Sequence, residues 1–173
     1  MFWRALRSVA ILPGMVVVLM PAGILWVFRD THRAHNVAPA SSASFWSGIV
    51  LALCGVAMIA WTVSLFAGIG RGTLAPWEPP KHLVVRGPYR HVRNPMISGV
   101  LAALLGEAIF FQSWPLAAWF LVFFAGNAIY FPLVEEPGLQ RRFGEEYTLY
   151  RRYVPRWVPR LRPWDLTPTP NKP

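Results

Sequence analysis

The sequence predicts an all-α polytopic membrane protein with about four transmembrane helices and a C-terminal amphipathic helix on the cytoplasmic side. Of the 173 residues 54% are hydrophobic and only 14% are charged, which is too apolar for an ordinary soluble domain. Crossing the hydrocarbon core takes about 20 apolar residues in a helix. Four stretches approach this length, at about residues 9–28, 45–69, 95–111 and 115–134. We therefore treat residues 1–173 as one membrane domain.

The first stretch, residues 9–28, follows Arg4 and Arg7 in the manner of a signal peptide. Its length and the lack of a small-residue cleavage site favour a retained span. A short polar loop, residues 30–44, comes next. It contains His32 and His35, and two histidines without a third ligand predict no metal site. Cys54 is the only cysteine, so neither a disulfide nor a cysteine metal site is expected.

The basic residues predict the orientation of the four spans. Fifteen of the 17 lysines and arginines fall on one side, and only Arg29 and Arg33 fall on the other. By the positive-inside rule both termini are cytoplasmic, in a cell (inner) membrane. The net charge is +9. The basic residues that produce it lie next to the span ends and do not form one soluble face. This favours contact with anionic lipid headgroups, and nucleic acid is not expected as a partner.

The loop of residues 70–94 separates the second and third spans. Its entry carries Gly68, Gly70 and Gly72, but these glycines follow a membrane helix and not a strand, so a nucleotide-binding Rossmann loop is not predicted. The second half of the loop, from Lys81 onward, is polar, basic and interrupted by glycine and proline up to Pro95. Irregular backbone of this kind is tolerated in a membrane protein where water or a polar ligand satisfies it. We therefore expect a functional site here.

Spans three and four are joined by only about residues 112–114, which predicts an antiparallel helical hairpin. The hairpin brings the Arg93-Asn94-Pro95 segment close to the Glu135-Glu136 pair. Pro95 suits the first position of a helix, whose free N–H groups attract a carboxylate or phosphate. A glutamate can accept hydrogen bonds from an amine or from ribose hydroxyls. The ligand expected here has an anionic end and a cationic end.

An amphipathic segment, residues 138–165, follows the fourth span and precedes a tail, residues 166–173, that is expected to be disordered. Leu139, Phe143, Tyr147 and Tyr150 are spaced by four, four and three residues, which indicates one helical face. We expect this helix to lie at the membrane surface and to end before Pro155. Its aromatic side chains are suited to packing against a purine or a sulfonium group.

Two motifs together resemble the isoprenylcysteine carboxyl methyltransferase and phospholipid methyltransferase family. One is Leu83-Val84-x-x-Gly87-Pro88-Tyr89-x-x-x-Arg93-Asn94-Pro95, and the other is Glu135-Glu136-x-x-Leu139-x-x-x-Phe143-Gly144-x-x-Tyr147-x-x-Tyr150. The resemblance implies an integral-membrane enzyme that binds S-adenosyl-L-methionine. The cofactor-binding residues that it implies are Lys81, His82, Leu83, Val84, Gly87, Tyr89, Asn94, Pro95, Met96, Ile97, Glu135 and Tyr147. Arg93 and Glu136 would orient the catalytic site.

The chain departs from the family pattern at three positions. Asn94 stands where the family usually has histidine, Ile97 stands where tyrosine is expected, and Phe131 stands where carboxyl methyltransferases have an arginine that meets the substrate carboxylate. A phenylalanine cannot neutralise a carboxylate. The expected methyl acceptor is therefore a lipophilic amine, thiol or hydroxyl and not a prenylcysteine carboxylate.

Three alternatives stay open from the sequence. They are an isoprenylcysteine-type carboxyl methyltransferase, a non-catalytic membrane subunit, and an NADPH-dependent reductase-like protein. Cofactor binding would distinguish between them. Inverted repeats typical of a small transporter are not evident, and the oligomeric state does not follow from the sequence.

Overall fold

The computed structural model describes residues 13–31, 36–69 and 83–165, with the side chains of residues 66–69 excepted. In this part of the chain every regular element is a helix, as the sequence predicts. The elements are η1 (Met15–Leu19), α2 (Met20–Val27), α3 (Ala43–Ile69), η2 (Gly87–Arg90), α4 (Pro95–Phe110), α5 (Trp114–Tyr130), η3 (Phe131–Glu135) and α6 (Glu136–Tyr153). The predictions for residues 9–12, His32, His35, residues 70–82 and the tail 166–173 lie outside the described residues.

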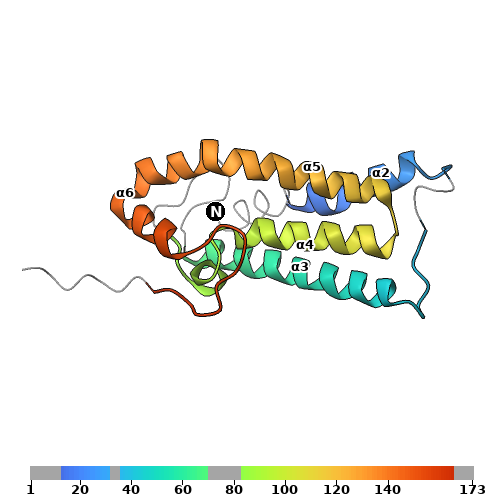
Figure 1. Ribbon diagram of the computed structural model, residues 1–173, viewed down its shortest axis with the longest axis horizontal. Helices are drawn as coiled ribbons and strands as arrows, with labels where there is room; N and C mark the ends of the chain where they lie inside the picture. Colours follow the sequence, from blue (N-terminus) through green and yellow to red (C-terminus); the bar gives the residue numbers. More distant parts are fainter. Residues whose placement is uncertain (1–12, 32–35, 70–82, 166–173) are drawn as a thin grey trace, which may run out of the picture.

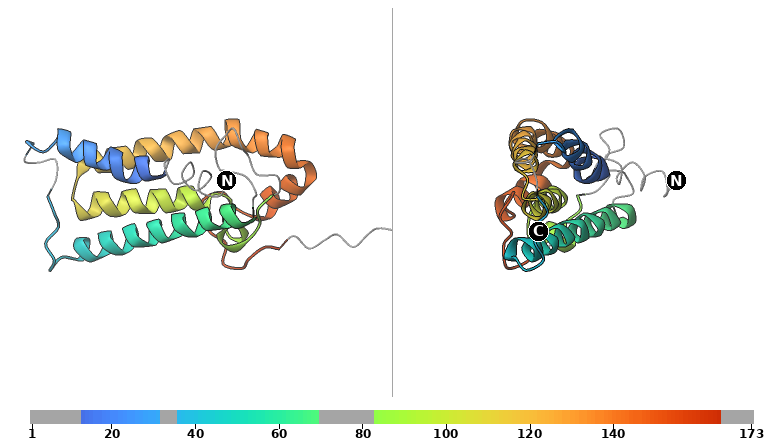
Figure 2. Two further views of the ribbon diagram at one scale, coloured as in Figure 1. Left: turned by 180° about the vertical axis from the view of Figure 1, so that it is seen from behind. Right: turned by 90° about the vertical axis from the view of Figure 1, so that its right-hand side faces the viewer.

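Three long helices, α3, α4 and α5, run along the long axis of the molecule, and α2 lies beside α5 (Figure 1). Seen along this axis, α4 lies between α3 and α5 (Figure 2). Two helices are long and apolar enough to cross a membrane, namely Ala43–Leu65 and the continuous helix Trp114–Tyr153. Met15–Val27 and Pro95–Phe110 are shorter apolar helices at the positions of the other two expected spans. The number of crossings stays a prediction.

Glycines hold α3 and α4 at unusually close range. A Cβ atom placed at Gly55 of α3 would lie 2.5 Å from backbone atoms of Gly99 and Ala103 in α4. One placed at Gly106 would lie 2.5 Å from Ala52 and 2.7 Å from Gly48. Small residues let two helix backbones approach closely, which is a main source of packing energy between helices in a membrane. The pairing of α3 with α4 therefore depends on these glycines.

The other side of α4 forms the apolar core. Val100, Ala103 and Leu104 are buried there together with Val17 of η1. Partly buried rings from α5 pack against this cluster, and Trp119 donates a hydrogen bond of 3.3 Å to the backbone carbonyl of Val16. Because α4 contacts helices on both sides, its N-terminus is held firmly in place.

The helix that begins as α5 does not stop at residue 134, the predicted end of the fourth span. A single π-helical turn, η3, joins α5 to α6 without a break, and the N–H of Glu136 donates to the carbonyl of Phe131. Pro132 explains the wide turn, because proline has no N–H to donate and its ring clashes with the preceding helical turn. Pro137 is tolerated because it lies in the first turn of α6.

Gly144 is where α6 changes direction. Its backbone angles, φ 53° and ψ −124°, are not helical, and a residue with a Cβ atom would be strained at this positive φ. The second half of α6 turns back toward the loop before α4 (Figures 1 and 2). Leu139 and Phe143 before this break and Tyr147 and Tyr150 after it belong to one apolar cluster, and Leu83 and Val85 of the same chain also pack there.

Candidate functional site

The loop before α4 is anchored on α3. Val84 and Tyr89 are buried and pack against Leu65. At Gly87, φ is +55°, and a Cβ atom would lie 3.0 Å from Leu65 and 3.2 Å from Trp61. Only glycine meets both the backbone and the space requirement at this position without strain. Gly87 therefore lets the loop turn tightly over the end of α3 and places η2 against it.

A buried ion-pair cluster lies where this loop meets α6. Arg93 Nη1 and Arg156 Nε each donate to Glu136 Oε1 at 2.7 Å, and Arg151 Nε lies 3.5 Å from Glu136 Oε2. The side chain of Glu136 is 4% exposed and that of Arg93 is 10% exposed. A carboxylate buried this deeply is stable only when cations and hydrogen bonds compensate it. Arg93 and Glu136, which were predicted to act together, are in direct contact.

Two tyrosines of α6, Tyr147 and Tyr150, pack against the loop before α4. The hydroxyl of Tyr150 donates a hydrogen bond of 2.7 Å to the backbone carbonyl of Tyr89. Tyr147 and Tyr150 are buried, with ring centroids 6.2 Å apart, and Leu83 packs against this cluster. Tyr150 thus links the predicted cofactor-binding residue Tyr89 to the cluster that holds Leu83 and Tyr147.

Glu135 follows the last residue of the predicted fourth span and lies at the end of η3. Burial raises the pKa of Glu135 to about 7, and the neighbouring charge of Glu136 adds to this increase. Burial also raises the pKa of Tyr89 well above its ordinary value, and the charges of Tyr150 and Glu135 contribute. Glu135 is therefore a half-buried carboxyl group whose pKa is raised by burial and by a neighbouring negative charge, and it is suited to receiving a cation.

The N-terminus of α4 holds two buried donors whose capacity is not used within the described residues. Asn94 precedes Pro95 as the N-cap of α4, and its side chain makes no capping hydrogen bond. Asn94 Nδ2 and Arg93 Nε are buried and have no hydrogen-bond partner within the described residues. Unpaired buried donors are costly. An acceptor-rich ligand, such as one with a carboxylate or ribose hydroxyls, would satisfy them.

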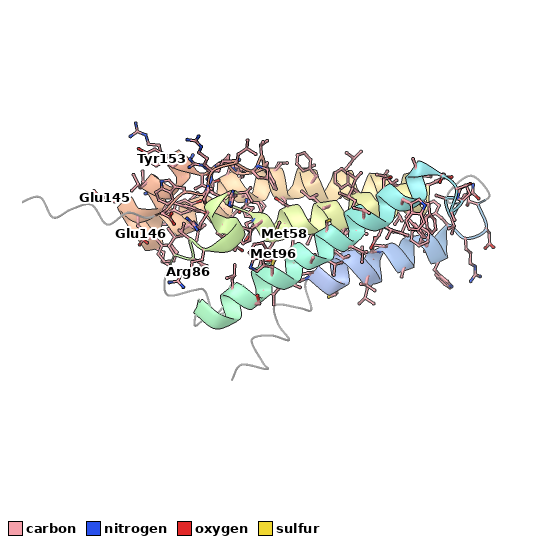
Figure 3. The ribbon with its side chains drawn as sticks, turned by 90° about the horizontal axis from the view of Figure 1, so that it is seen from below. Met58, Arg86, Met96, Glu145, Glu146 and Tyr153 are labelled. Carbon is pink, nitrogen blue, oxygen red and sulfur yellow. The ribbon has the colours of Figure 1, made fainter. Side chains whose placement is uncertain are left out.

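The remaining predicted residues lie along the start of α4 or outside the described part. Met96 and Ile97 are half-buried in the first turn of α4. Met96 and Met58 of α3 are drawn where the two helices meet, whereas Arg86, Glu145 and Glu146 lie farther toward the α6 end of the molecule (Figure 3). Lys81 and His82 are outside the described residues. Pro95 is buried at the first position of α4, as predicted.

Sequence reasoning missed Arg156 as a member of this site. It was treated as one of several basic residues near the membrane surface. Nothing local in the sequence pairs it with Glu136, because the two residues are 20 positions apart and an irregular segment intervenes. The Val154-Pro155-Arg156 sequence does signal the end of α6. It does not show where the chain goes next.

Position 131, which the sequence analysis linked to the choice of acceptor, also has an unexpected neighbour. Phe131 is 5% exposed, and its ring meets that of Trp157 edge to face with centroids 5.9 Å apart. Trp157 also contacts Phe124 of α5, at 5.7 Å. Phe131 is thus part of an aromatic group that includes a residue from beyond α6.

Comparison with known proteins gives one informative result. A family model described as phospholipid methyltransferase matches residues 43–146, which is more than half of the chain and includes α3, α4, α5 and the Glu135-Glu136 pair. No curated protein matches significantly. The match confirms the resemblance seen in the two motifs, and this chain belongs to the phospholipid methyltransferase family.

Proposed function

We propose that this protein is an integral-membrane methyltransferase that binds S-adenosyl-L-methionine between the loop before α4 and the Glu135-Glu136 pair. The observation that carries the proposal is the meeting of these two motifs, joined by the 2.7 Å contact between Arg93 and Glu136. Family membership supports the reaction class. The cytoplasmic position of the site follows from the predicted orientation, in which this end of the molecule carries most of the basic residues.

The residues present fit the chemistry of this cofactor. Its amino and sulfonium groups are positive, and Glu135 is the half-buried carboxyl group available to hold a positive group. Its carboxylate and ribose hydroxyls are acceptors, and Asn94 offers a buried donor for one of them. Glu136 is occupied by Arg93 and Arg156, so we assign it an orienting role.

When bound, S-adenosyl-L-methionine supplies a methyl group on a positively charged sulfur that a nucleophile can attack. The protein then has to align donor and acceptor and to exclude water. Buried loop residues such as Val84 and Tyr89 can exclude water. The Arg93–Glu136 pair fixes the distance between the loop and the start of α6. No strong base is needed when the acceptor is a free amine or a thiolate.

The surroundings of Phe131 support a lipophilic acceptor without a free carboxylate. Phe131 is packed against Trp157, and a carboxylate in a partly dry site without a cation costs several kcal/mol. Three of the arginines that could replace the missing charge have other partners, since Arg90 pairs with Asp165, and Arg151 and Arg156 pair with Glu136. Arg71 lies outside the described residues. An amine, thiol or hydroxyl of a lipid is the proposed acceptor class.

The test is to incubate the purified protein with methyl-labelled S-adenosyl-L-methionine and a membrane lipid extract. We expect label to enter an apolar lipid fraction in a way that depends on the protein. A Glu135→Gln variant serves as the matched control and should transfer much less label. Labelling of a free carboxyl group, recognised because the ester releases label in base, would contradict the proposed acceptor class. The absence of labelled lipid would count against the reaction itself.

A further inference from the structure

The chain after α6 forms a strap, residues 154–165, that runs back across the loop before α4. The N–H groups of Arg93, Arg160 and Trp164 donate backbone hydrogen bonds of 2.9–3.0 Å to Pro155, His91 and Arg90 respectively. The ring nitrogen Nδ1 of His91 also lies 2.8 Å from the carbonyl of Arg160. The strap lies beyond the residues that match the family model, 43–146, and nothing in that match assigns it a role.

Apolar contacts fix the strap at both ends. Val154 is 1% exposed and belongs to the buried cluster with Tyr147 and Tyr150. Trp164 stacks on Tyr153 with ring centroids 5.8 Å apart and an interplanar angle of 14°. Figure 1 shows this segment passing beside η2 and the start of α4. A segment held by backbone hydrogen bonds and buried side chains has a defined position, so its polar side chains are held in place as well.

Arg156 is the strap residue that enters the site. Its Nε donates to Glu136 Oε1 at 2.7 Å, and this same oxygen accepts from Arg93. Arg156 is 24% exposed, and Arg151, the third cation, is 54% exposed and lies farther away at 3.5 Å. Arg156 and Arg93 thus provide the two short contacts that hold this carboxylate. Glu136 is in turn the direct neighbour of Glu135.

We propose that Arg156 is a positioning residue that holds Glu136 against Arg93, so that the strap keeps the neighbouring Glu135 in place to bind the cofactor. This inference rests on the proposed function, since it assigns Glu135 to the cofactor. The cluster carries more positive than negative charge around Glu136. These cations offset part of the negative charge that Glu136 presents to Glu135, and Arg156 supplies one of the two close ones.

Loss of Arg156 should act on Glu135 through charge. With Arg156 replaced by a neutral residue, Glu136 is less well compensated, and its negative charge opposes ionisation of Glu135 more strongly. The ionisable groups near the glutamate pair in the described part of the chain are Tyr89, Arg93, Tyr147, Arg151 and Arg156. Of these groups, only Arg156 is replaced in the variant. Cofactor affinity should then fall near neutral pH and recover as the pH is raised.

The experiment measures the affinity of the purified full-length protein for S-adenosylhomocysteine, the demethylated product, by calorimetry from pH 6 to pH 9. Arg156→Gln removes the charge, and Arg156→Lys keeps it. Arg162→Gln removes an exposed arginine of the same strap and serves as the matched control. The thermal unfolding midpoint of each protein is measured without ligand. Binding is compared only at temperatures where all of them are folded.

We expect Arg156→Gln to weaken binding about tenfold at pH 7 and to shift the midpoint of its pH dependence upward. Arg156→Lys should recover most of the affinity, and Arg162→Gln should bind like the unchanged protein. A purely structural role for Arg156 would lower affinity equally at every pH, which would overturn the inference. Unchanged binding by folded Arg156→Gln would overturn it too.

The unchanged protein separates this inference from the proposed function. If it binds neither S-adenosylhomocysteine nor S-adenosyl-L-methionine, the proposed function is wrong and the inference is wrong with it. If the unchanged protein binds, and Arg156→Gln binds with the same affinity as Arg162→Gln at every pH, only the role assigned to Arg156 is wrong. If Arg156→Gln fails to fold, Arg156→Lys decides the question. A normal affinity and pH midpoint in that variant would support positioning by charge, and a loss equal at all pH values would contradict it.

Discussion

Arg93 donates a 2.7 Å hydrogen bond to the carboxylate of Glu136, although the two residues are 43 positions apart in the chain. The contact joins the polar loop before α4 to the helix that follows α5. Both side chains are at least nine-tenths buried. A charged pair in this setting ties the two motifs of the site together, because either partner left alone would be an uncompensated buried charge.

Breaking this pair should destabilise the protein. Arg93→Gln is expected to lower the free energy of unfolding by about 3–5 kcal/mol, the range for removing one partner of a buried ion pair. Denaturant unfolding in detergent, followed by tryptophan fluorescence, measures the change. Arg29→Gln is the matched control, because Arg29 and Asp30 are 59% and 89% exposed and such pairs contribute less than about 1 kcal/mol. Equal effects would contradict the central role of the Arg93–Glu136 contact.

Close packing of α3 on α4 should make Gly55 intolerant of a side chain. Gly55→Ala places a Cβ atom 2.5 Å from the backbone of α4, so the helices must separate, and the thermal unfolding midpoint should fall by several degrees. Gly126→Ala in α5 is the control, since nothing lies within 4 Å of its Cβ position. There the expected change is neutral or stabilising, because alanine favours a helix over glycine. A Gly55→Ala protein as stable as Gly126→Ala would show that the helices are not packed this closely.

Glu135, at the end of η3, should matter for the cofactor more than Glu107, the carboxyl group of α4. Glu135→Gln is expected to weaken binding of S-adenosyl-L-methionine by about 1–3 kcal/mol, the range for losing a charged hydrogen-bond partner. Glu107→Gln, which changes a carboxyl group at the opposite end of α4, should have a much smaller effect. Calorimetry on both variants measures the difference. Equal effects, or the reverse order, would mean that the site is misplaced.

The raised pKa of Glu135 predicts a pH dependence for this binding. The charged form holds the cation, and the pKa of Glu135 in the unliganded protein is about 7. Affinity should therefore be low at pH 6, rise as the pH passes through 7 and level off near pH 8. In Glu135→Gln this rise should be absent. If the variant kept the same rise, another group would have to be responsible for it.

The aromatic character of position 131 predicts the preference for the methyl acceptor. Phe131→Arg should raise activity toward a prenylcysteine analogue several-fold, because a cation would then face the free carboxylate. Phe131→Leu changes the size of the side chain without adding charge and should not raise it. Methyl transfer to the analogue is measured in parallel for both variants. Efficient methylation of the analogue by the unchanged protein would show that an arginine elsewhere supplies the charge.

Several features could be predicted from the sequence because they leave local signals. Apolar runs marked the helices, Pro95 marked the start of α4, and the short connection at residues 112–114 indicated the hairpin. That hairpin is what allowed Arg93 and Glu136 to be placed together. The continuation of the fourth span into α6, through Pro137, was not predicted. The preceding π turn lets the helix continue through it, and hydrophobic periodicity does not show such a turn.

The strap could not be predicted for a different reason. Its contacts with residues 90–93 include three backbone hydrogen bonds across more than 60 positions, and such bonds leave no pattern in either segment. The spacing of Leu139 and Tyr147 predicted that they pack together, and both belong to one apolar cluster. Periodicity shows that a face is buried but not what covers it, and here Leu83 and Val85 do so.

The most direct test of the central claim is calorimetric titration of the purified, folded protein with S-adenosyl-L-methionine and with S-adenosylhomocysteine in detergent at pH 8, where Glu135 is expected to be charged. We predict that both ligands bind at about micromolar strength and that Glu135→Gln weakens both. Folded protein that releases no heat and shows no thermal shift with either ligand would contradict the claim that Glu135 and the loop before α4 form a cofactor site.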